Sequence, residues 1–574
     1  MKQIMLGNEA VARGAYEAGV KVIASYPGTP STEITESAAQ YKEIAAQWSP
    51  NEKVALEVAG GAAIAGARAM SCMKHVGLNV AADPLFTLSY TGINSGLVIA
   101  VADDPGMHSS QNEQDSRFYA RSAHIPMLEP SDSAEALEYT KLAYELSEKH
   151  DTPVLLRLTT RISHSRSIVE TGERAETSKE YVKDITKYVM VPAMAKGRHV
   201  VVEKRDVAIA EEAYSLYINR QELRSEEIGI ICSGAAYQYV KEAVPEASIL
   251  KLGMVWPLSF RLIEEFAAKV KKLYVIEELE PFLHDAIAAR GICVEDRLFS
   301  LQGELSANIV ARAFGVKADA DFKEEQLPGR PPVMCPGCPH RPVFQAFNKL
   351  KLTVSGDIGC YSLGALPPHS SMDTCICMGA GISAALGMEK ANDDAFRKKL
   401  VAVIGDSTFI HSGITGLIDM AYNGGKGTVV ILDNSITGMT GHQQNPSTGK
   451  TLSGLEVEPA NIEALCRAAG VKNVTVCDPF DVKLFEKELK AALALDELAV
   501  IIARRPCALI IKRLPPYTVT EDCRECGLCL KTGCPALSGL GGKTVIDEAL
   551  CNGCGLCARI CPFNAIQREG EATV

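Results

Sequence analysis

The sequence predicts a multidomain α/β protein in which doubly wound parallel-sheet domains precede a small α+β domain at the C-terminus. Short apolar runs such as residues 97–102 end in loops rich in Gly, Pro and Asp, a pattern typical of buried parallel strands. Of the 19 cysteines, eight fall between Cys523 and Cys561, which marks a separate small domain. A chain of 574 residues exceeds one hydrophobic core and predicts roughly three to five domains.

The expected elements follow the chain in order. Residues 1–165 and 226–316 alternate apolar strands with helical stretches, whereas residues 166–225 are more charged and resemble a connector. A polar, Pro-containing linker at residues 319–332 precedes a further α/β domain at 333–515, and Pro515-Pro516 separates that domain from the tail, residues 516–574. Strands are expected at residues 22–26, 97–102, 153–158, 228–232, 272–277, 400–404 and 428–432.

The net charge of the chain argues against two classes of partner. The net charge of -11 disfavours nucleic acid as the main partner and also disfavours anionic membrane surfaces. No apolar run reaches the roughly 18 residues that a bilayer span requires. The N-terminal residues have a single lysine and no long apolar stretch, unlike a signal peptide, so we expect a cytoplasmic protein without a membrane anchor.

The cysteines of the tail form two similar groups. The second group matches the bacterial ferredoxin pattern C-x2-C-x2-C-x3-C-P, while the first has one extra residue before its last cysteine. Two structural zinc sites are the alternative, but zinc ribbons rarely carry the third cysteine or the terminal Cys-Pro. We therefore expect a ferredoxin-like domain with two [4Fe–4S] clusters. In two-cluster ferredoxins the fourth cysteine ligates the other cluster, so the expected ligand sets are Cys523, Cys526, Cys529 and Cys561, and Cys551, Cys554, Cys557 and Cys534.

A second motif lies in the domain at 333–515. Gly405-Asp406-Ser407 follows one predicted strand, and Asn434 follows the next predicted strand at the spacing typical of thiamine-diphosphate enzymes. Mg²⁺ prefers oxygen ligands, which Asp406, Asn434 and the carbonyl group of Ile436 can supply beside the diphosphate. A plain strand–turn–helix capped by Asp406 is the alternative for the first half alone. The amides that open a helix in the small-residue run 378–387 are expected to face phosphate.

Thiamine chemistry also requires a carboxylate against the aminopyrimidine ring. The Gly/Ala-rich segment 52–68 predicts a helix that a cofactor can approach closely. We choose Glu57 as this acid, because it precedes Gly66 by the nine residues that thiamine enzymes often show. Glu52 remains the alternative, and either carboxylate could instead be an exposed helix residue.

Several segments resemble those of the large subunits of indolepyruvate:ferredoxin oxidoreductases, members of the 2-oxoacid:ferredoxin oxidoreductase superfamily. They are YPGTPSTE at 26–33, MKHVGLNVAAD at 73–83, CPGCPHR at 335–341 and GDIGCY at 356–361. The resemblance covers essentially the whole chain. It implies a pyrimidine-binding domain, a transketolase C-terminal-like domain, a diphosphate-binding domain and a ferredoxin domain, in that order.

The resemblance also implies roles for individual residues. Cofactor contacts are expected from Thr29, Pro30, Cys335, Cys360 and Thr440, and a contact of His340 with the substrate carboxylate. A structured Pro/Gly turn is the alternative for the loop at 335–341. His75 could also face the substrate or be a structural histidine. One position departs from the pyruvate enzymes, because Met439 stands where their catalytic asparagine is found. This favours a bulkier, less polar substrate.

The resemblance implies oxidative decarboxylation of indolepyruvate and other arylpyruvates to the acyl-CoA, with reduction of ferredoxin. The same chemistry on phenylpyruvate, a branched-chain 2-oxoacid or pyruvate, and a non-redox thiamine-dependent decarboxylase, are the alternatives. Since a further domain of the wider family is missing from this chain, a smaller second subunit is implied, in a heterodimer or heterotetramer.

Overall fold

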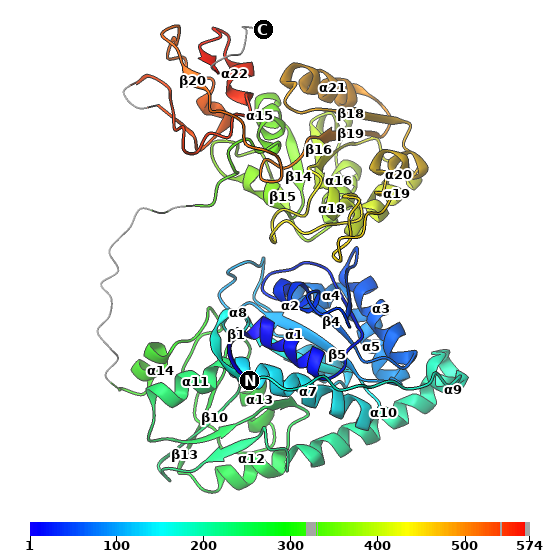
Figure 1. Cartoon of the computed structure of the whole chain (residues 1–574), viewed down its shortest axis with the longest axis vertical. Helices are drawn as coiled ribbons and strands as arrows, with labels where there is room; N and C mark the ends of the chain where they lie inside the picture. The colour runs from blue at the N-terminus through cyan, green and yellow to red at the C-terminus, as the bar shows by residue number, and fades with distance from the viewer. Residues whose placement is uncertain (317–328, 330, 540–541, 569–574) are drawn as a thin grey trace. The chain divides into compact units, whose positions relative to one another are not determined.

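The structure is a computed structural model that describes residues 1–316, 329, 331–539 and 542–568. It divides into two compact units, Met1–Gln326 and Leu327–Val574, which we treat separately (Figure 1). The predicted linker at 319–332 lies almost entirely outside the described residues.

Unit 1 is built on a seven-stranded sheet of order β12-β6-β7-β5-β4-β2-β3, parallel except for β12. Helices α1 and α7 cover one face, and α3 and α5 cover the other. The strands predicted at 22–26, 97–102 and 153–158 are β2, β5 and β7. The strands span Val22–Ser25 (β2), Ala45–Trp48 (β3), Ala69–Lys74 (β4), Leu97–Asp103 (β5), Met127–Leu128 (β6), Val154–Thr159 (β7) and Met254–Trp256 (β12). The helices span Gly7–Glu17 (α1), Thr32–Ala38 (α2), Glu52–Ile64 (α3), His75–Val80 (α4), Ala82–Thr91 (α5), Arg117–Ala123 (α6), Ser133–His150 (α7) and Thr160–His164 (α8).

The rest of unit 1 carries a four-stranded sheet of order β13-β10-β11-β9. The segment expected as a connector, 166–225, contributes to both parts of the unit, because β8 pairs with β1 and β9 pairs with β11. β12, from the region 226–316, joins the seven-stranded sheet. These elements span Lys2–Leu6 (β1), Arg166–Glu170 (β8), Ile185–Tyr188 (α9), Pro192–Ala213 (α10), Arg220–Glu222 (β9), Ile228–Cys232 (β10), Gly234–Ala243 (α11), Ser248–Lys251 (β11), Phe260–Ala267 (α12), Lys272–Ile276 (β13), Phe282–Ala288 (α13) and Ala307–Ala313 (α14).

Unit 2 contains a six-stranded, fully parallel sheet of order β15-β14-β16-β17-β19-β18. α15 and α21 pack on one face, and α16, α19 and α20 on the other. The predicted strands at 400–404 and 428–432 are β16 and β17, the central pair. The strands span Thr353–Gly356 (β14), Thr374–Cys375 (β15), Leu400–Gly405 (β16), Thr428–Asp433 (β17), Asn473–Cys477 (β18) and Ala499–Arg504 (β19). The helices span His340–Leu350 (α15), Cys360–Ala365 (3-10), Ala380–Lys390 (α16), Asp394–Arg397 (α17), Asp406–Thr408 (α18), Phe409–Gly413 (π), Ile414–Tyr422 (α19), Ile462–Ala468 (α20) and Val482–Ala494 (α21).

The tail of unit 2 is a small α+β domain that lies beside α15 in Figure 1. Two antiparallel strand pairs, β20–β23 and β21–β22, are joined by loops that carry the cysteines. This agrees with the predicted ferredoxin-like domain. Its elements span Thr518–Val519 (β20), Leu530–Thr532 (3-10), Leu537–Ser538 (β21), Val545–Ile546 (β22), Leu556–Ile560 (α22) and Ile566–Gln567 (β23).

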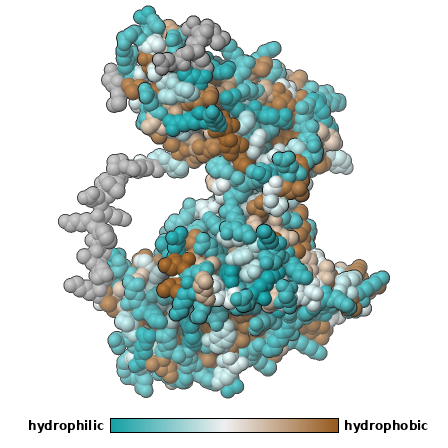
Figure 2. Space-filling model, viewed as in Figure 1, coloured by the Kyte–Doolittle hydropathy of each residue, from teal (hydrophilic) through white to brown (hydrophobic). Residues whose placement is uncertain are grey.

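The surface is mixed in character. The face shown in Figure 2 is largely hydrophilic, with smaller hydrophobic areas between. Across the described residues, none of the helices combines the length and the apolarity that a membrane crossing demands.

Candidate functional site

The carboxyl ends of β16 and β17 bring the predicted oxygen ligands together. Gly405 ends β16 and Asp406 follows it, buried and accepting a hydrogen bond from the Ser407 N–H at 2.8 Å. A side chain at position 405 would collide with the ring of Tyr361, since a Cβ there would lie 2.8 Å from a ring carbon. Neighbouring parallel strands end at the same edge of a sheet, and this edge is where Asp406 and Asn434 meet.

The amide group of Asn434 faces two oxygens. It lies 3.2 Å from Oδ1 of Asp406 and 2.8 Å from the carbonyl oxygen of Ile436. Adjacent oxygens of a Mg²⁺ octahedron are about 2.9 Å apart, given metal–oxygen distances of about 2.05 Å. With its nitrogen turned inward, the amide donates two hydrogen bonds. With its oxygen turned inward, three oxygens converge as a divalent cation requires. The three groups therefore fit Mg²⁺.

Burial, together with the nearby carboxylate of Asp433, raises the pKa of Asp406 to about 7. Asp433 itself is held by Arg504, whose Nε donates to Asp433 Oδ2 at 2.7 Å. A carboxyl group that is costly to ionise in the metal-free protein gains most from a cation.

Three thiols lie beside this oxygen cluster. Cys360 is close to Gly438, where a Cβ would lie 3.5 Å from its sulfur. Burial raises the pKa of Cys360 to about 11, and the neighbouring thiols of Cys507 and Cys335 contribute. The backbone N–H of Cys507 donates to the Asn434 carbonyl oxygen at 2.9 Å. The predicted cofactor contacts Cys335 and Cys360 are thus adjacent to the predicted metal ligands.

His340 begins α15 and is buried, and its ring meets the ring of Tyr361 edge-on at 5.9 Å. Burial lowers the pKa of His340 to about 4, so the imidazole is neutral at physiological pH. A neutral histidine can donate one hydrogen bond to a carboxylate but offers it no charge.

Thr440 and Met439 lie in the loop that follows Asn434. Thr440 Oγ1 donates to Gln443 Oε1 at 2.5 Å, and backbone bonds between Thr437 and Gln443 close the loop. The side chain of Met439 is 56% exposed. The structure therefore leaves Met439 exposed to solvent, whereas the hydroxyl of Thr440 is bonded within the loop itself.

The prediction that the first amides of the small-residue helix face phosphate was wrong for two of them. α16 forms as expected, but the N–H groups of Gly379 and Gly381 both donate to the carboxylate of Asp357 at 2.8 Å. Asp357 is buried, and burial raises its pKa to about 6. The motif GDIGC contains this aspartate, so the signal was present, but sequence reasoning did not use it.

In unit 1 the two candidate acids lie in different environments. The side chain of Glu57 is 46% exposed and pairs with Lys53 on the helix surface. Glu52 is 5% exposed and packs against Gly77, where a Cβ would lie 2.6 Å from Glu52 Oε1. The structure thus argues against Glu57, because a solvated carboxylate paired with a lysine is poorly placed to bind a buried ring.

Glu52 is surrounded by polar groups that sequence reasoning missed. Burial lowers the pKa of Lys74 to about 8, while the carboxylates of Asp104 and Glu52 favour its charged form. Lys74 Nζ donates to the Ser109 carbonyl oxygen at 2.8 Å, and the Ser109 hydroxyl donates to the Thr29 carbonyl oxygen at 3.0 Å.

Pro30, the neighbour of Thr29, accepts a hydrogen bond from Asn8 Nδ2 at 2.7 Å through its carbonyl oxygen. The ring of His75 is buried and its Nε2 lies 3.0 Å from Asn112 Oδ1. The loop with Thr29 and Pro30 therefore lies at the same sheet edge as Glu52, and Lys74 and Ser109 connect the two.

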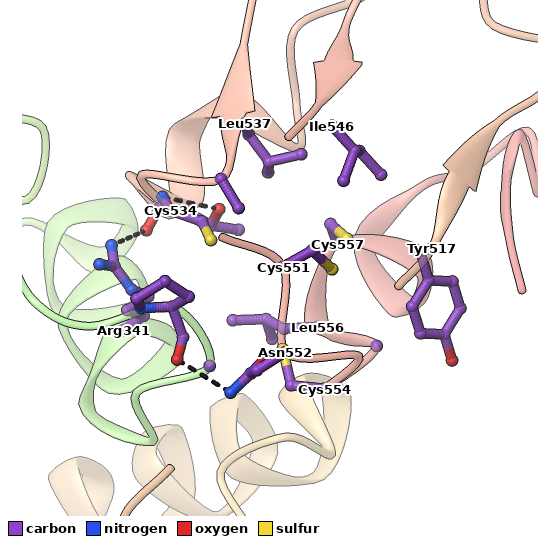
Figure 3. Close-up of a pocket in the computed structure, with 15 residues that line it drawn as sticks. Arg341, Tyr517, Cys534, Leu537, Ile546, Cys551, Asn552, Cys554, Leu556 and Cys557 are labelled. Carbon is purple, nitrogen blue, oxygen red and sulfur yellow. Dashed lines mark hydrogen bonds between the residues drawn. The ribbon is translucent and has the colours of Figure 1, made fainter. Parts of the chain in front are cut away.

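The eight tail cysteines line two separate pockets. One pocket, which we call the near pocket, is lined by Cys534, Cys551, Cys554 and Cys557 (Figure 3). The other, the far pocket, is lined by Cys523, Cys526, Cys529 and Cys561. These are the two sets that the crossed ferredoxin pattern predicts, and each set includes one cysteine from the opposite half of the domain.

The near pocket adjoins the Cys335 loop. Pro336, Gly337 and Arg341 line it together with the cysteines, and Asn552 Nδ2 donates to the Pro336 carbonyl oxygen at 3.0 Å (Figure 3). The same loop carries Cys335 and His340 toward Cys360 and Tyr361. One short loop therefore connects the oxygen cluster with a four-cysteine pocket, and neither Arg341 nor Asn552 was singled out from the sequence.

Comparison with known proteins finds the same kinds of domain in this chain. Three family models match: pyruvate flavodoxin/ferredoxin oxidoreductase, thiamine diP-bdg, at 13–227; thiamine pyrophosphate enzyme, C-terminal TPP binding domain, at 357–503; and 4Fe-4S binding domain, at 544–567. The indolepyruvate oxidoreductase subunit IorA of Archaeoglobus fulgidus is 41% identical over 99% of this chain and 97% of its own length. The chain belongs to this family. The Pyrococcus horikoshii and Methanothermobacter thermautotrophicus (strain Delta H) proteins of the same name are 40% and 39% identical, each over 99% of this chain and 98% of their own length.

Membership in the IorA family confirms the resemblance and the fold class that the sequence predicted. The chain carries thiamine-diphosphate-binding domains and an iron–sulfur domain. It is thus a thiamine-diphosphate-dependent, iron–sulfur oxidoreductase of this family.

Proposed function

We propose that this chain is the catalytic subunit of an indolepyruvate:ferredoxin oxidoreductase. It would convert indolepyruvate and other arylpyruvates to the acyl-CoA and carbon dioxide, and pass the electrons to ferredoxin. The observation that carries this proposal is the short loop in unit 2 that joins an oxygen cluster of the thiamine type to a four-cysteine pocket. The full-length relatives named indolepyruvate oxidoreductase support the choice of substrate.

Asp406, Asn434 and the Ile436 carbonyl group would hold Mg²⁺, with Gly405 and Ser407 beside the diphosphate. The inward atom of the Asn434 amide lies 3.2 Å from Asp406 Oδ1 and 2.8 Å from the Ile436 carbonyl oxygen, distances that suit cis positions of an octahedron. Bound thiamine diphosphate supplies the nucleophilic carbon and accepts the electron pair that decarboxylation leaves. Cys335, Cys360, Thr440, Thr29 and Pro30 remain the proposed cofactor contacts, and His340 the proposed substrate contact.

We assign the activating acid to Glu52 in place of Glu57. Its buried position beside Gly77 and Lys74 supports this role. Glu52 would hold a proton against the aminopyrimidine ring, and the positively charged side chain of Lys74 lies near its carboxylate. Glu57 also pairs with a lysine, Lys53, but it lies on the helix surface and lacks the burial that this role requires.

The near and far pockets would each hold one [4Fe–4S] cluster. The near cluster would receive electrons first, because its pocket shares the Cys335 loop with the oxygen cluster. The far cluster would pass them to ferredoxin. A smaller second subunit, in a heterodimer or heterotetramer, and coenzyme A complete the proposed assembly; the relatives' names include the word subunit.

The test is anaerobic. The chain is purified with its small subunit and mixed with thiamine diphosphate, Mg²⁺, coenzyme A and indolepyruvate, while the visible absorbance of the clusters is followed. We expect rapid bleaching, and no bleaching in the Glu52→Gln variant. If no 2-oxoacid bleaches the loaded enzyme and an aldehyde is released instead, the protein is a non-redox decarboxylase and the proposal fails.

A further inference from the structure

Arg341 is a buried cation at the wall of the near pocket (Figure 3). Arg341 is 1% exposed, and its guanidinium donates hydrogen bonds to three backbone carbonyl oxygens. Nε donates to Cys335 at 3.0 Å, Nη1 to Thr532 at 3.0 Å, and Nη2 to Met334. Carbonyl groups satisfy its hydrogen bonds but leave its positive charge without a full counter-charge.

The ionisable groups that lie near the Arg341 guanidinium are cysteine thiols. Those that act on its guanidinium are led by Cys534 and include Cys554, two of the four cysteines of the near pocket. A Cβ at Gly533, the residue before Cys534, would lie 3.3 Å from Arg341 Nη1. The cation therefore lies directly against the backbone that presents one proposed cluster ligand.

A buried charge is costly unless an opposite charge offsets it. Four thiolates around a [4Fe–4S] core carry a net negative charge, which grows by one when the cluster accepts an electron. A fixed cation beside the cluster stabilises the reduced form more than the oxidised form, and so raises the reduction potential. An iron–sulfur cluster in the near pocket and the guanidinium of Arg341 would thus offset each other.

The far pocket lacks an equivalent among its lining residues. The arginine that lines it, Arg524, is solvent-exposed, and exposed charges are screened by water and salt. The two pockets therefore differ in one feature that sets cluster potentials, which is a desolvated positive charge.

We propose that Arg341 is the counter-charge of the near cluster and raises its reduction potential above the value that the cysteine ligands alone would give. In this scheme Arg341 acts on the near cluster through its charge and takes no direct part in catalysis. The tuned near cluster accepts electrons from the thiamine site more readily. This inference rests on the proposed function only in requiring an iron–sulfur cluster in the near pocket.

The test is a redox titration of the full chain with its small subunit, loaded with iron and sulfide and followed by electron paramagnetic resonance. We expect Arg341→Gln to move one of the two midpoint potentials to a more negative value and to leave the other in place. Arg341→Lys, which keeps the charge, should stay close to wild type. The matched control is Arg524→Gln, which removes the exposed charge of the far pocket and should move neither midpoint appreciably.

A second variant serves if the Arg341→Gln protein does not assemble its iron–sulfur clusters. His369 lies near Arg341, because its neighbour Pro368 and the Arg341 guanidinium both approach Gly533. Burial, together with the charge of Arg341, lowers the pKa of His369 to about 4. His369→Asp would place a carboxylate near Arg341 and neutralise it in place. We expect the same negative shift.

Unchanged midpoints in a fully loaded Arg341→Gln or His369→Asp variant would overturn the inference. An Arg341→Lys variant that loses the near cluster would also overturn it, because the fork of hydrogen bonds and not the charge would then matter. A wild-type chain that binds iron for fewer than two clusters would count against the proposed function instead. The two failures are therefore distinguishable.

Discussion

At the scale of single residues, burial distinguishes the two glutamates that the sequence offers as candidates for one role. Glu52 and Glu57 lie five positions apart on α3, and the helix turns one toward Gly77 and the other toward Lys53. A helix advances about 100° per residue, so a separation of five positions puts side chains on different faces. Glu52 therefore lies on the buried face of α3, and Glu57 lies on its exposed face.

The first prediction concerns these two acids. Glu52→Gln should lower kcat for indolepyruvate by at least about 100-fold, the usual contribution of a positioned acid or base. Glu57→Gln is the control and should stay within about twofold of wild type, since an exposed pair with Lys53 contributes little. Steady-state reduction of a ferredoxin or dye measures both, and equal losses in the two variants would contradict the assignment.

The second prediction follows from the raised pKa of Asp406, about 7, which burial chiefly causes. Below pH 7 the metal-free protein keeps Asp406 protonated, and Mg²⁺ must displace that proton. The apparent Mg²⁺ affinity should therefore fall by up to about tenfold for each pH unit below 7 and level off above 8. Calorimetric titration with Mg²⁺ and thiamine diphosphate at several pH values measures this. An affinity that does not change between pH 5.5 and 8 would show that Asp406 is not the ligand.

At the scale of elements, close packing between α3 and α4 confines the carboxylate of Glu52. Gly77, in α4, leaves no room for a side chain beside the Glu52 carboxylate. Gly61, in α3, has open space where a Cβ would lie. The two glycines make a matched pair, because both are helical and only one touches the carboxylate.

The third prediction uses this pair. Gly77→Ala should displace the carboxylate of Glu52 and lower kcat by about 10- to 100-fold, as expected for a misplaced catalytic group. Gly61→Ala should leave kcat unchanged and stabilise the helix by up to about 1 kcal/mol. Activity and thermal unfolding are measured on both variants. If Gly77→Ala retained full activity, Glu52 would not be confined as we describe.

At the scale of the molecule, a buried ion network ties the two sheets of unit 1 together. Arg117, in α6, pairs with Asp115 and with Glu277, both at 2.6 Å. Glu277 follows β13 of the four-stranded sheet. Its carboxylate also accepts hydrogen bonds from the backbone N–H groups of Leu283 and His284, each at 3.0 Å. Removing Arg117 would leave the buried carboxylates of Asp115 and Glu277 without the cation that pairs with both.

The fourth prediction is that Arg117→Met destabilises the chain by about 3–5 kcal/mol at pH 8. Burial raises the pKa of Glu277, so its protonated form is favoured in the fold, and the loss should be smaller at pH 5. Arg261→Met is the control, because Arg261 pairs with Glu265 on the surface and should cost at most about 1 kcal/mol. Calorimetry of the full chain at both pH values tests this; equal effects of the two substitutions would refute a role for the network.

The fifth prediction concerns the crossed cysteine sets. Cys534→Ser should abolish or perturb the cluster held by Cys551, Cys554 and Cys557, and leave the other cluster intact. The crossed ligation that places Cys534 in the near pocket is the reason. Iron analysis and electron paramagnetic resonance should show one altered signal. An effect confined to the cluster of Cys523 would mean that each half binds its own fourth cysteine.

The sequence by itself determined the local features. Apolar runs predicted β2, β5, β7, β10, β13, β16 and β17, and fixed spacings predicted the thiamine domain and the iron–sulfur domain. The family was implied by the resemblance of whole segments to known large subunits. Such signals are readable because a motif is set by chemistry within a few residues of chain: a cubane fixes the spacing of its cysteines, and a parallel strand fixes an apolar run.

The tertiary structure decided what depends on contacts between distant segments. It buries Glu52 and exposes Glu57, pairs the N–H groups of Gly379 and Gly381 with Asp357, places β12 in the seven-stranded sheet, and buries Arg341 near Cys534. Each of these outcomes depends on which side of an element becomes desolvated. Burial is a property of the packed fold, and no local pattern of residues encodes it alone.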